Sequence, residues 1–129
     1  MSRAVDTNVV VRYLTGDDPD QSAVATTILR EDFMLTATVL VETEWVLRSA
    51  YRWPRLRIAA ALEALVDLPG ANCAVDGVGW ALARMRTGAD LADMVHILMA
   101  AGATGFATFD TRLAAAAGAD APLTIETLA

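Results

Sequence analysis

Acidic side chains recur at four places in the chain where they could bind a metal ion or transfer a proton. Asp6 and Asp110 each follow a short apolar segment, Glu42 lies within a helical pattern, and Asp90 and Asp93 open another. Several carboxylates at one point repel each other unless a hard cation neutralises them, and Mg²⁺ and Mn²⁺ prefer such oxygen ligands. A metal held in this way suits hydrolysis of a phosphodiester, because it lowers the pKa of a bound water and stabilises charge on the phosphate.

Each aspartate also has a purely structural explanation. Asp is a preferred N-cap residue, so Asp6, Asp90 and Asp110 could each cap a helix, and Asp93 could be a favourable carboxylate in a first helical turn. Asp90 and Asp93 are three residues apart, so they point the same way on a helix. Considered one at a time, these aspartates are better explained as helix caps. Considered together, they are better explained as a metal site.

The helical pattern around Glu42 contains a second glutamate. Glu42 lies among apolar residues, Trp45 included, that we expect to be mostly core, and Glu is almost never fully buried without a partner. A Glu at the rim of an amphipathic helix is equally ordinary. Glu44 faces roughly the opposite direction, so only one of the two glutamates can serve a given site. His96, three residues after Asp93, is expected in the core or at its rim and receives no catalytic role.

Short apolar strands alternate with longer helical patterns around these acids. Strands are expected at 3–5, 33–36, 71–75, 106–109 and around 123–125. Helices are expected at 8–14, about 19–30, 38–51, 57–68 and 91–101. A further helix is expected to end near 86, after a start that Gly77 and Gly79 weaken, and a short one follows 110. This alternation predicts an α/β fold with a mostly parallel sheet covered on both faces. Ligands in such folds bind beyond the carboxyl ends of the strands, where Asp6 and Asp110 are expected.

The composition limits the number of domains and the classes of function that the chain can have. With 129 residues and 55% hydrophobic side chains, the chain predicts one domain over residues 1–129. It has no lysine, which excludes Walker-type phosphate loops, protein kinases, Schiff-base enzymes and receiver domains. The single Cys73 excludes an internal disulfide and a thiolate zinc site. No run approaches the roughly 20 apolar residues of a membrane span, so a cytoplasmic location is expected.

Four motifs in order give a family resemblance over almost the whole chain. They are Val5–Leu14 with its Asp-Thr-Asn, Glu42–Arg48, Asp90–His96, and Thr108–Asp110. Together they resemble PIN-domain ribonucleases, and most of all the VapC-type toxins of type II (VapBC) toxin–antitoxin systems. The resemblance implies a three-layer α/β/α sandwich with a central, mostly parallel sheet. It also implies an endoribonuclease that hydrolyses RNA phosphodiester bonds with Mg²⁺ or Mn²⁺.

The resemblance also implies a role for each matching residue. Metal-binding and catalytic roles fall to Asp6, Glu42, Asp93 and Asp110, an auxiliary metal role to Asp90, and supporting roles to Thr7, Asn8 and Thr108. We expect a metal held by Asp6 and Asp93, with or without Asp110, to orient a water that Glu42, Asp110 or both activate. One or two metal ions fit this scheme equally.

Partners are implied in the same way. A cognate VapB-type antitoxin would lay a helix and an extended tail into a groove among the first helices and inhibit the site. Homodimerisation, and a heterotetramer or larger assembly with the antitoxin, are implied likewise. Two other functions remain open: a related PIN or flap-type nuclease acting on DNA or precursor RNA, and a PIN-like module that only binds protein.

The net charge of −6 counts against an RNA partner at first sight. Setting aside Asp6, Glu42, Asp93 and Asp110 leaves 12 acids against 10 arginines, so much of the excess belongs to the proposed site. A group of arginines follows the Glu42 helix and could bind RNA phosphates or form an ordinary solvated surface. Its members are Arg48, Arg52, Arg55 and Arg57, with Arg84 and Arg86 as a second small group.

Overall fold

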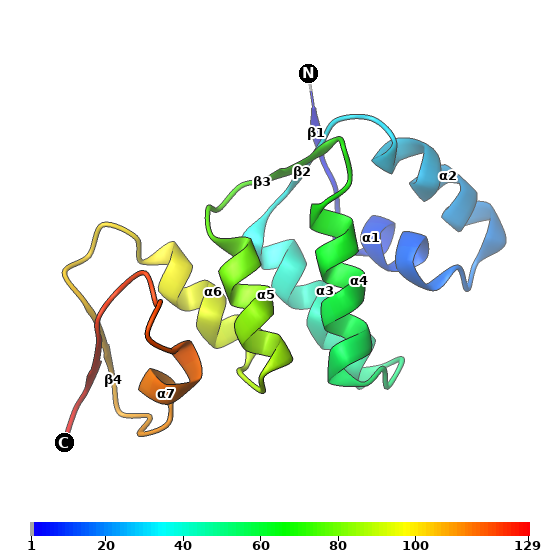
Figure 1. The fold of residues 1–129 in the computed structure, drawn as a ribbon. Helices are drawn as coiled ribbons and strands as arrows, with labels where there is room; N and C mark the ends of the chain where they lie inside the picture. Colours follow the sequence, from blue (N-terminus) through cyan, green and yellow to red (C-terminus); the bar gives the residue numbers. More distant parts are fainter. Residues whose placement is uncertain (1) are drawn as a thin grey trace. The chain divides into compact units, whose positions relative to one another are not determined.

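A computed structural model of the protein describes residues 2–129 (Figure 1). The chain forms two compact units, the first extending to Ala74 and the second from Val75 to Ala129. A single domain over residues 1–129 stays a prediction. Among the described residues, no helix is long and apolar enough to cross a membrane.

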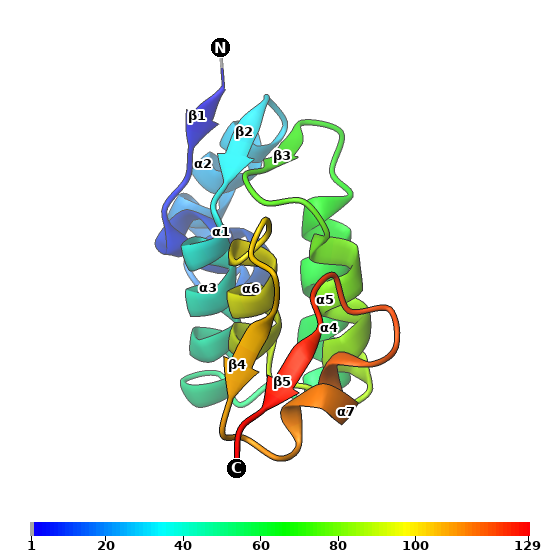
Figure 2. The same ribbon diagram turned by 90° about the vertical axis from the view of Figure 1, so that its left-hand side faces the viewer.

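Strands and helix pairs alternate in the first unit. Its elements are β1 (Arg3–Ala4), α1 (Thr7–Thr15), α2 (Pro19–Leu29), β2 (Phe33–Leu35), α3 (Ala37–Ser49), α4 (Arg55–Val66) and β3 (Ala71–Cys73). The strands form a parallel sheet in the order β1-β2-β3, and Figure 2 shows them side by side. Parallel neighbours need long crossover connections, which the helix pairs supply.

Local sequence explains where these helices begin and end. Asp6, Asp18 and Thr36 are the N-cap residues of α1, α2 and α3, and each accepts a backbone N–H bond through its side chain. Gly16 ends α1 in the left-handed region with φ 65°, which glycine adopts without strain. α4 starts at Arg55, two residues before the expected start, because Pro54 provides an extended residue directly before a helix.

The core of the first unit lies where the inner faces of the helices meet each other and the sheet. α1 packs against α2 and α3, and α3 packs against α4, which also contacts β3. Its largest fully buried side chains are Val10, Phe33, Leu35, Leu40, Leu47, Ile58, Leu62 and Leu65. Trp45 does not belong to it: 57% of its surface is exposed, so the expectation that this part of α3 is core was wrong for Trp45.

The second unit contains two strands and three helices within its described residues. Its elements are α5 (Val78–Arg86), α6 (Leu91–Met99), β4 (Phe106–Thr108), α7 (Leu113–Ala117) and β5 (Ile125–Thr127). β4 and β5 pair in parallel, α5 packs on α6, and α7 packs on β5. Arg84 on α5 donates to the carbonyls of Ala116 (2.8 Å) and Ala115 (3.3 Å) in α7, so it ties the two helices together.

The α/β class with parallel strands and flanking helices is confirmed. The strands form a three-stranded and a two-stranded sheet, each entirely parallel. The last strand starts at Ile125, two residues later than its expected start, because its pairing with β4 begins where Ile125 lies opposite Phe106. β4 ends at Thr108, one residue early, which leaves Phe109 and Asp110 in the loop that follows.

Candidate metal centre

Asp6 stands at the point where β1 gives way to α1. Its Oδ1 atom accepts the backbone N–H of Thr7 at 2.8 Å, so Asp6 does cap the helix. The side chain is nevertheless exposed. Capping and cation binding are compatible, since a carboxylate offers about four lone-pair sites.

Thr7 joins the first predicted acid to the second. It is 5% exposed, and its hydroxyl donates to Oε1 of Glu42 on α3 at 2.5 Å. This bond links the first turn of α1 to α3 and fixes the Glu42 carboxylate next to the residue that follows Asp6. Within the first unit, Asp6, Thr7 and Glu42 are therefore brought together.

Glu44 is occupied elsewhere. It is 6% exposed, and Arg48, one turn further along α3, donates to both of its carboxylate oxygens, at 2.8 Å from Nε and 3.2 Å from Nη2. A bidentate arginine bond satisfies a buried carboxylate and compensates its charge. The geometry thus favours Glu42 over Glu44 for the site. The i,i+4 spacing of Glu44 and Arg48 was a sequence signal for this pair.

Asp90 and Asp93 lie in the first turn of α6. Asp90 is the N-cap, and its Oδ1 accepts the backbone N–H of Asp93 at 3.1 Å. Burial raises the pKa of Asp93, and the negative charges of Asp90 and Asp110 raise it further, while His96 acts in the opposite direction. Three aspartates of the second unit are therefore close enough for two of them to disfavour the charge on the third.

Asp110 organises the loop after β4. Its backbone N–H donates to Oγ1 of Thr108 at 3.0 Å, and its own Oδ1 accepts the N–H of Arg112 at 2.9 Å. The N-cap of α7 is Arg112, so Asp110 holds a turn and does not cap a helix. The Arg112 guanidinium is 3.9 Å from the Asp110 carboxylate, and that arginine is almost fully exposed.

The donor set fits a hard divalent cation, although no ligand cage is already closed. Within either unit, over residues 2–129, no three His, Cys, Asp or Glu side chains are arranged to hold a metal ion. The predicted ligands are all carboxylates, the oxygen donors that Mg²⁺ and Mn²⁺ prefer. Burial is the main cause of the raised pKa of Asp93, and the negative charges of Asp90 and Asp110 add to it; a bound cation would relieve that electrostatic part.

Removing the charge of Asp90 should lower the pKa of Asp93. Asn caps a helix as well as Asp does, so Asp90→Asn keeps the first turn of α6. Because Asp90 raises the pKa of Asp93, we expect the variant's Asp93 carboxyl to titrate at lower pH, which carboxyl NMR in EDTA would measure. Asp120→Asn, at an exposed position of the same unit, is the control. An Asp93 titration that stays in place in Asp90→Asn contradicts this account.

The predicted RNA-binding arginines and His96 differ in what surrounds them. Arg57 stacks on the Trp53 ring at 3.8 Å from its centroid, and Arg52 is exposed with φ 56°, in the left-handed region. Arg55 is exposed as well, and RNA binding by this group stays a prediction. His96, expected in the core or at its rim, is exposed and does not belong to the core; it lies on α6 three residues after the half-buried Asp93.

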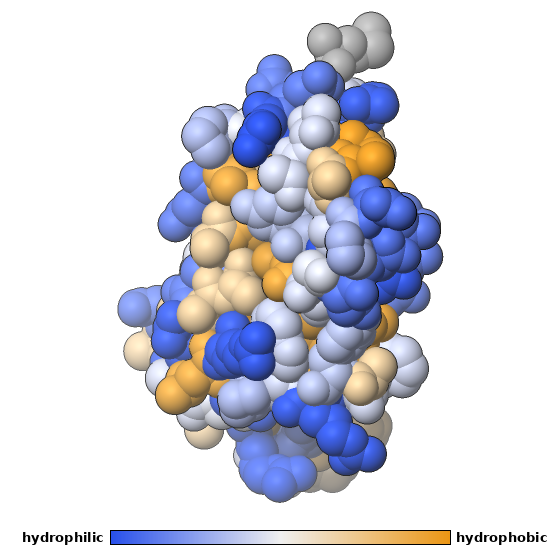
Figure 3. All heavy atoms as spheres, turned by 90° about the vertical axis from the view of Figure 1, so that its right-hand side faces the viewer, coloured by the Kyte–Doolittle hydropathy of each residue, from blue (hydrophilic) through white to orange (hydrophobic). Residues whose placement is uncertain are grey.

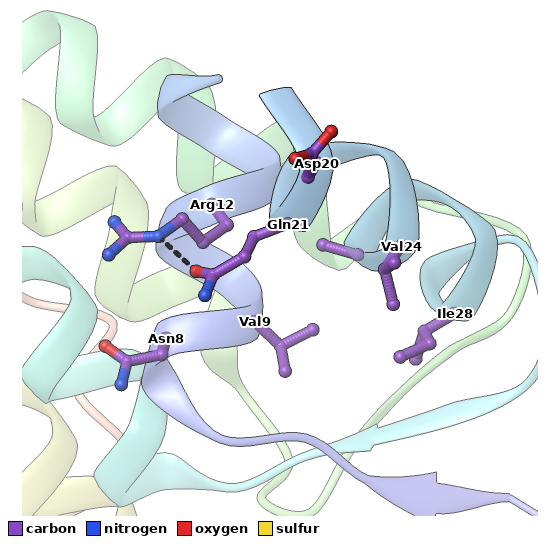
Figure 4. Close-up of a pocket in the computed structure, with 8 residues that line it drawn as sticks. Asn8, Val9, Arg12, Asp20, Gln21, Val24 and Ile28 are labelled. Carbon is purple, nitrogen blue, oxygen red and sulfur yellow. Dashed lines mark hydrogen bonds between the residues drawn. The ribbon is translucent and has the colours of Figure 1, made fainter. Parts of the chain in front are cut away.

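A groove of about 430 Å³ lies between α1 and α2 (Figure 4). Its lining residues are Asn8, Val9, Arg12, Asp20, Gln21, Val24, Ala25 and Ile28. Val24 is 61% exposed, and Figure 3 shows other places where hydrophobic residues reach the surface among hydrophilic ones. Arg12 donates to Gln21 across the groove at 2.8 Å, so its walls are partly polar. Asn8, predicted as a supporting residue, lies here in the first turn of α1.

Asp6 follows a parallel strand, Asp90 and Asp93 stand at the start of α6, and their carboxylate oxygens are donors that hard divalent cations prefer. The comparison with known families then places the chain within one of them. The PIN domain matches residues 3–119, so the chain belongs to the PIN domain family, whose members are typically phosphodiester nucleases and generally bind a divalent metal. No curated protein and no solved structure gives a significant match.

Proposed function

We propose that the protein is a Mg²⁺- or Mn²⁺-dependent endoribonuclease and the VapC-type toxin of a toxin–antitoxin pair. Membership of the PIN domain family supports nuclease chemistry, and the four motifs in order support the toxin assignment. The observation that carries the proposal is the grouping of three carboxylates in the second unit: Asp90 caps the helix turn that holds Asp93, and Asp90 and Asp110 both lie close enough to add to the effect of burial on the pKa of Asp93. Structural caps do not need a third carboxylate nearby, whereas a cation site does.

In this proposal, the carboxylate oxygens of Asp6 and Asp93, with or without those of Asp110, would hold the cation. A bound divalent cation supplies a water of lowered pKa and stabilises charge on the scissile phosphate. Glu42, Asp110 or both would orient the attacking water or take up its proton on a carboxylate oxygen. The Thr7 hydroxyl holds Glu42 in position through their hydrogen bond. Hydrolysis leaves a 5′-phosphate and a 3′-hydroxyl.

A VapB-type antitoxin is the proposed partner, and the α1–α2 groove is its proposed binding place. Val24 and Ile28 offer apolar surface for a helix, while Arg12 and Gln21 offer hydrogen-bonding groups. The groove includes Asn8, two residues after Asp6, so a segment bound there would lie near the first predicted acid. The proposal includes a homodimer, larger assemblies with the antitoxin, and a cytoplasmic location, where the RNA is found.

The decisive experiment is RNA cleavage by the purified protein with Mg²⁺, Mn²⁺ or EDTA, on structured RNAs that include tRNA. We expect metal-dependent cleavage that Asp6→Asn abolishes, because Asn keeps the helix cap but lacks the charge that binds a cation. Asp18→Asn makes the same change at the N-cap of α2, outside the site, and should leave cleavage intact.

Three outcomes would contradict the proposal. Cleavage by Asp6→Asn at the wild-type rate under the same metal conditions, in a preparation free of contaminating nuclease, would show that Asp6 does not serve the reaction. Cleavage of DNA in preference to RNA would favour a flap-type nuclease. Absence of any cleavage, together with tight protein binding, would favour a non-catalytic module.

A further inference from the structure

One large apolar side chain next to the candidate acids has no role in packing. Phe109 lies between Thr108 and Asp110, and 75% of its surface is exposed, whereas Phe33 is fully buried. Aromatic rings usually contribute to the core, where burial of their large apolar area is favourable. β4 ends at Thr108, so Phe109 is not part of the strand. The ring is therefore available to a ligand outside the fold.

The backbone on both sides of Phe109 is held by hydrogen bonds. The carbonyl of Thr108 accepts the N–H of Leu128 at 2.7 Å, and the Thr108 hydroxyl accepts the N–H of Asp110 at 3.0 Å. Asp110 in turn accepts the N–H of Arg112 at 2.9 Å. A ring presented on an ordered loop loses little conformational entropy when it binds a ligand.

We propose that Phe109 is a base-stacking residue, on which an unpaired base of the substrate RNA lies beside the cleaved phosphate. The inference rests on the proposed function, which assigns Asp110 to the site. Consecutive Cα atoms are about 3.8 Å apart, so the ring is attached to the chain one residue before Asp110, which is expected to serve the reacting phosphate. RNA is read mainly through unpaired bases stacked on aromatic side chains.

A protein partner fits this position less well than a base. The cores of protein interfaces are depleted of charged residues, but Asp110 and Arg112 are both exposed within three residues of Phe109. A standard interface buries roughly 1,200–2,000 Å², and one ring supplies only about 150–250 Å² of that. The exposed residues directly around the ring, Ala107 and Thr111, are small and add little apolar area.

Stacking also supplies affinity that the charges of this unit do not. Asp90, Asp93 and Asp110 repel phosphate when no cation is bound. Arg84 is engaged with the carbonyls of α7, and Arg112 lies beside Asp110. A neutral ring binds a base without adding charge, and it accepts any of the four RNA bases because every base has a π face. Phe109 would therefore set how tightly the RNA binds, while the acids set how fast it is cleaved.

The test compares wild-type protein with Phe109→Ala, Phe109→Leu and Phe109→Trp, using a short, labelled single-stranded RNA. Cleavage is measured with Mn²⁺ and binding with EDTA. In Phe109→Ala we expect KM and the RNA dissociation constant to rise roughly 5- to 150-fold, the factor that base–aromatic stacking contributes, with kcat nearly unchanged. Leu keeps apolar area without a stacking face and should resemble Ala, whereas Trp should resemble Phe. Because the ring is exposed, these variants should fold, and their Mn²⁺ affinity should match the wild type.

A second measurement identifies the stacked base. RNAs with one abasic nucleotide, moved step by step along the strand, are bound to wild type and to Phe109→Ala. At one position, loss of the base should weaken binding to wild type by about the same factor as Phe109→Ala. The two changes combined should cost no more than either alone, as expected for partners in one contact.

Several results would overturn the inference. An unchanged KM in Phe109→Ala, or a Leu variant as good as wild type, would show that stacking is not involved. A change of association state in Phe109→Ala, measured by light scattering, would assign the ring to a protein interface. If Phe109→Ala is unaffected while wild type cleaves RNA, only this inference fails. If wild type neither binds nor cleaves RNA, the proposed function fails and the inference with it.

Discussion

In Asp93→Asn we expect RNA cleavage to fall by roughly 10²- to 10⁴-fold, because a cation's charge stabilisation is worth several kcal/mol and each 1.36 kcal/mol is tenfold. At the same time, the metal-free variant should be more stable than wild type at neutral pH. Replacing a residue that served only to stabilise the fold would lower the stability of the protein. The two results together therefore separate a functional carboxylate from a structural one.

The expected gain in stability follows from the pKa of Asp93. Burial, Asp90 and Asp110 raise that pKa, so the ionised carboxylate is less favourable in the folded protein than in the unfolded chain. This cost is complete above the folded pKa, is relieved as the pH falls through it, and is absent below the unfolded value. Asn cannot ionise, so the variant escapes the cost at neutral pH.

Thermal unfolding with and without Mn²⁺ measures the stability part of this prediction, and an RNA cleavage assay measures the other part. Mn²⁺ should raise the melting temperature of wild type, because it binds only the folded state, and should have little effect on Asp93→Asn. Asp120→Asn, at an exposed position of the same unit, should behave like wild type in both assays. A metal-free Asp93→Asn that is less stable than wild type, or that still cleaves RNA at the wild-type rate, contradicts the assignment.

The positions of the acids along the secondary structure could be predicted from sequence because the signals are local. Asp90 followed by the apolar positions of α6 indicates a helix start, and Asp6 after a short apolar segment indicates a strand end. The structure adds what local patterns do not contain. The bond from Thr7 to Glu42 joins residues 35 positions apart, and no spacing rule predicts it.

The exposure of particular side chains was the least predictable property. Phe109 reads as the end of a strand by composition, but β4 stops at Thr108, where its pairing with β5 ends at Thr127. Trp45 fits the apolar pattern of α3, yet it lies on the exposed side. Burial of a single ring depends on which remote segment packs over it, and that information is not in the neighbouring residues.

The second large effect is expected from Arg48→Met, which should destabilise the protein by about 1–3 kcal/mol, since the buried Glu44 carboxylate loses its bidentate partner. The full cost of an unpaired buried charge is reduced here because 54% of the Arg48 side chain is exposed, so water can partly replace it. Against a total stability of about 5–15 kcal/mol for a domain, this is a substantial loss. Urea unfolding with linear extrapolation measures it.

Two further variants make the Arg48 result specific. Arg3→Met breaks the ion pair with Glu31, whose side chains are 65% and 66% exposed, and should change stability by no more than about 0.5 kcal/mol. The double variant Glu44→Met with Arg48→Met should recover much of the lost stability, because an apolar pair can replace a buried ion pair. If Arg48 serves Glu44 and not RNA, the double variant should also bind RNA as wild type does. If Arg48→Met is as stable as Arg3→Met, or if the double variant binds RNA more weakly than wild type, Arg48 would instead be assigned to RNA binding.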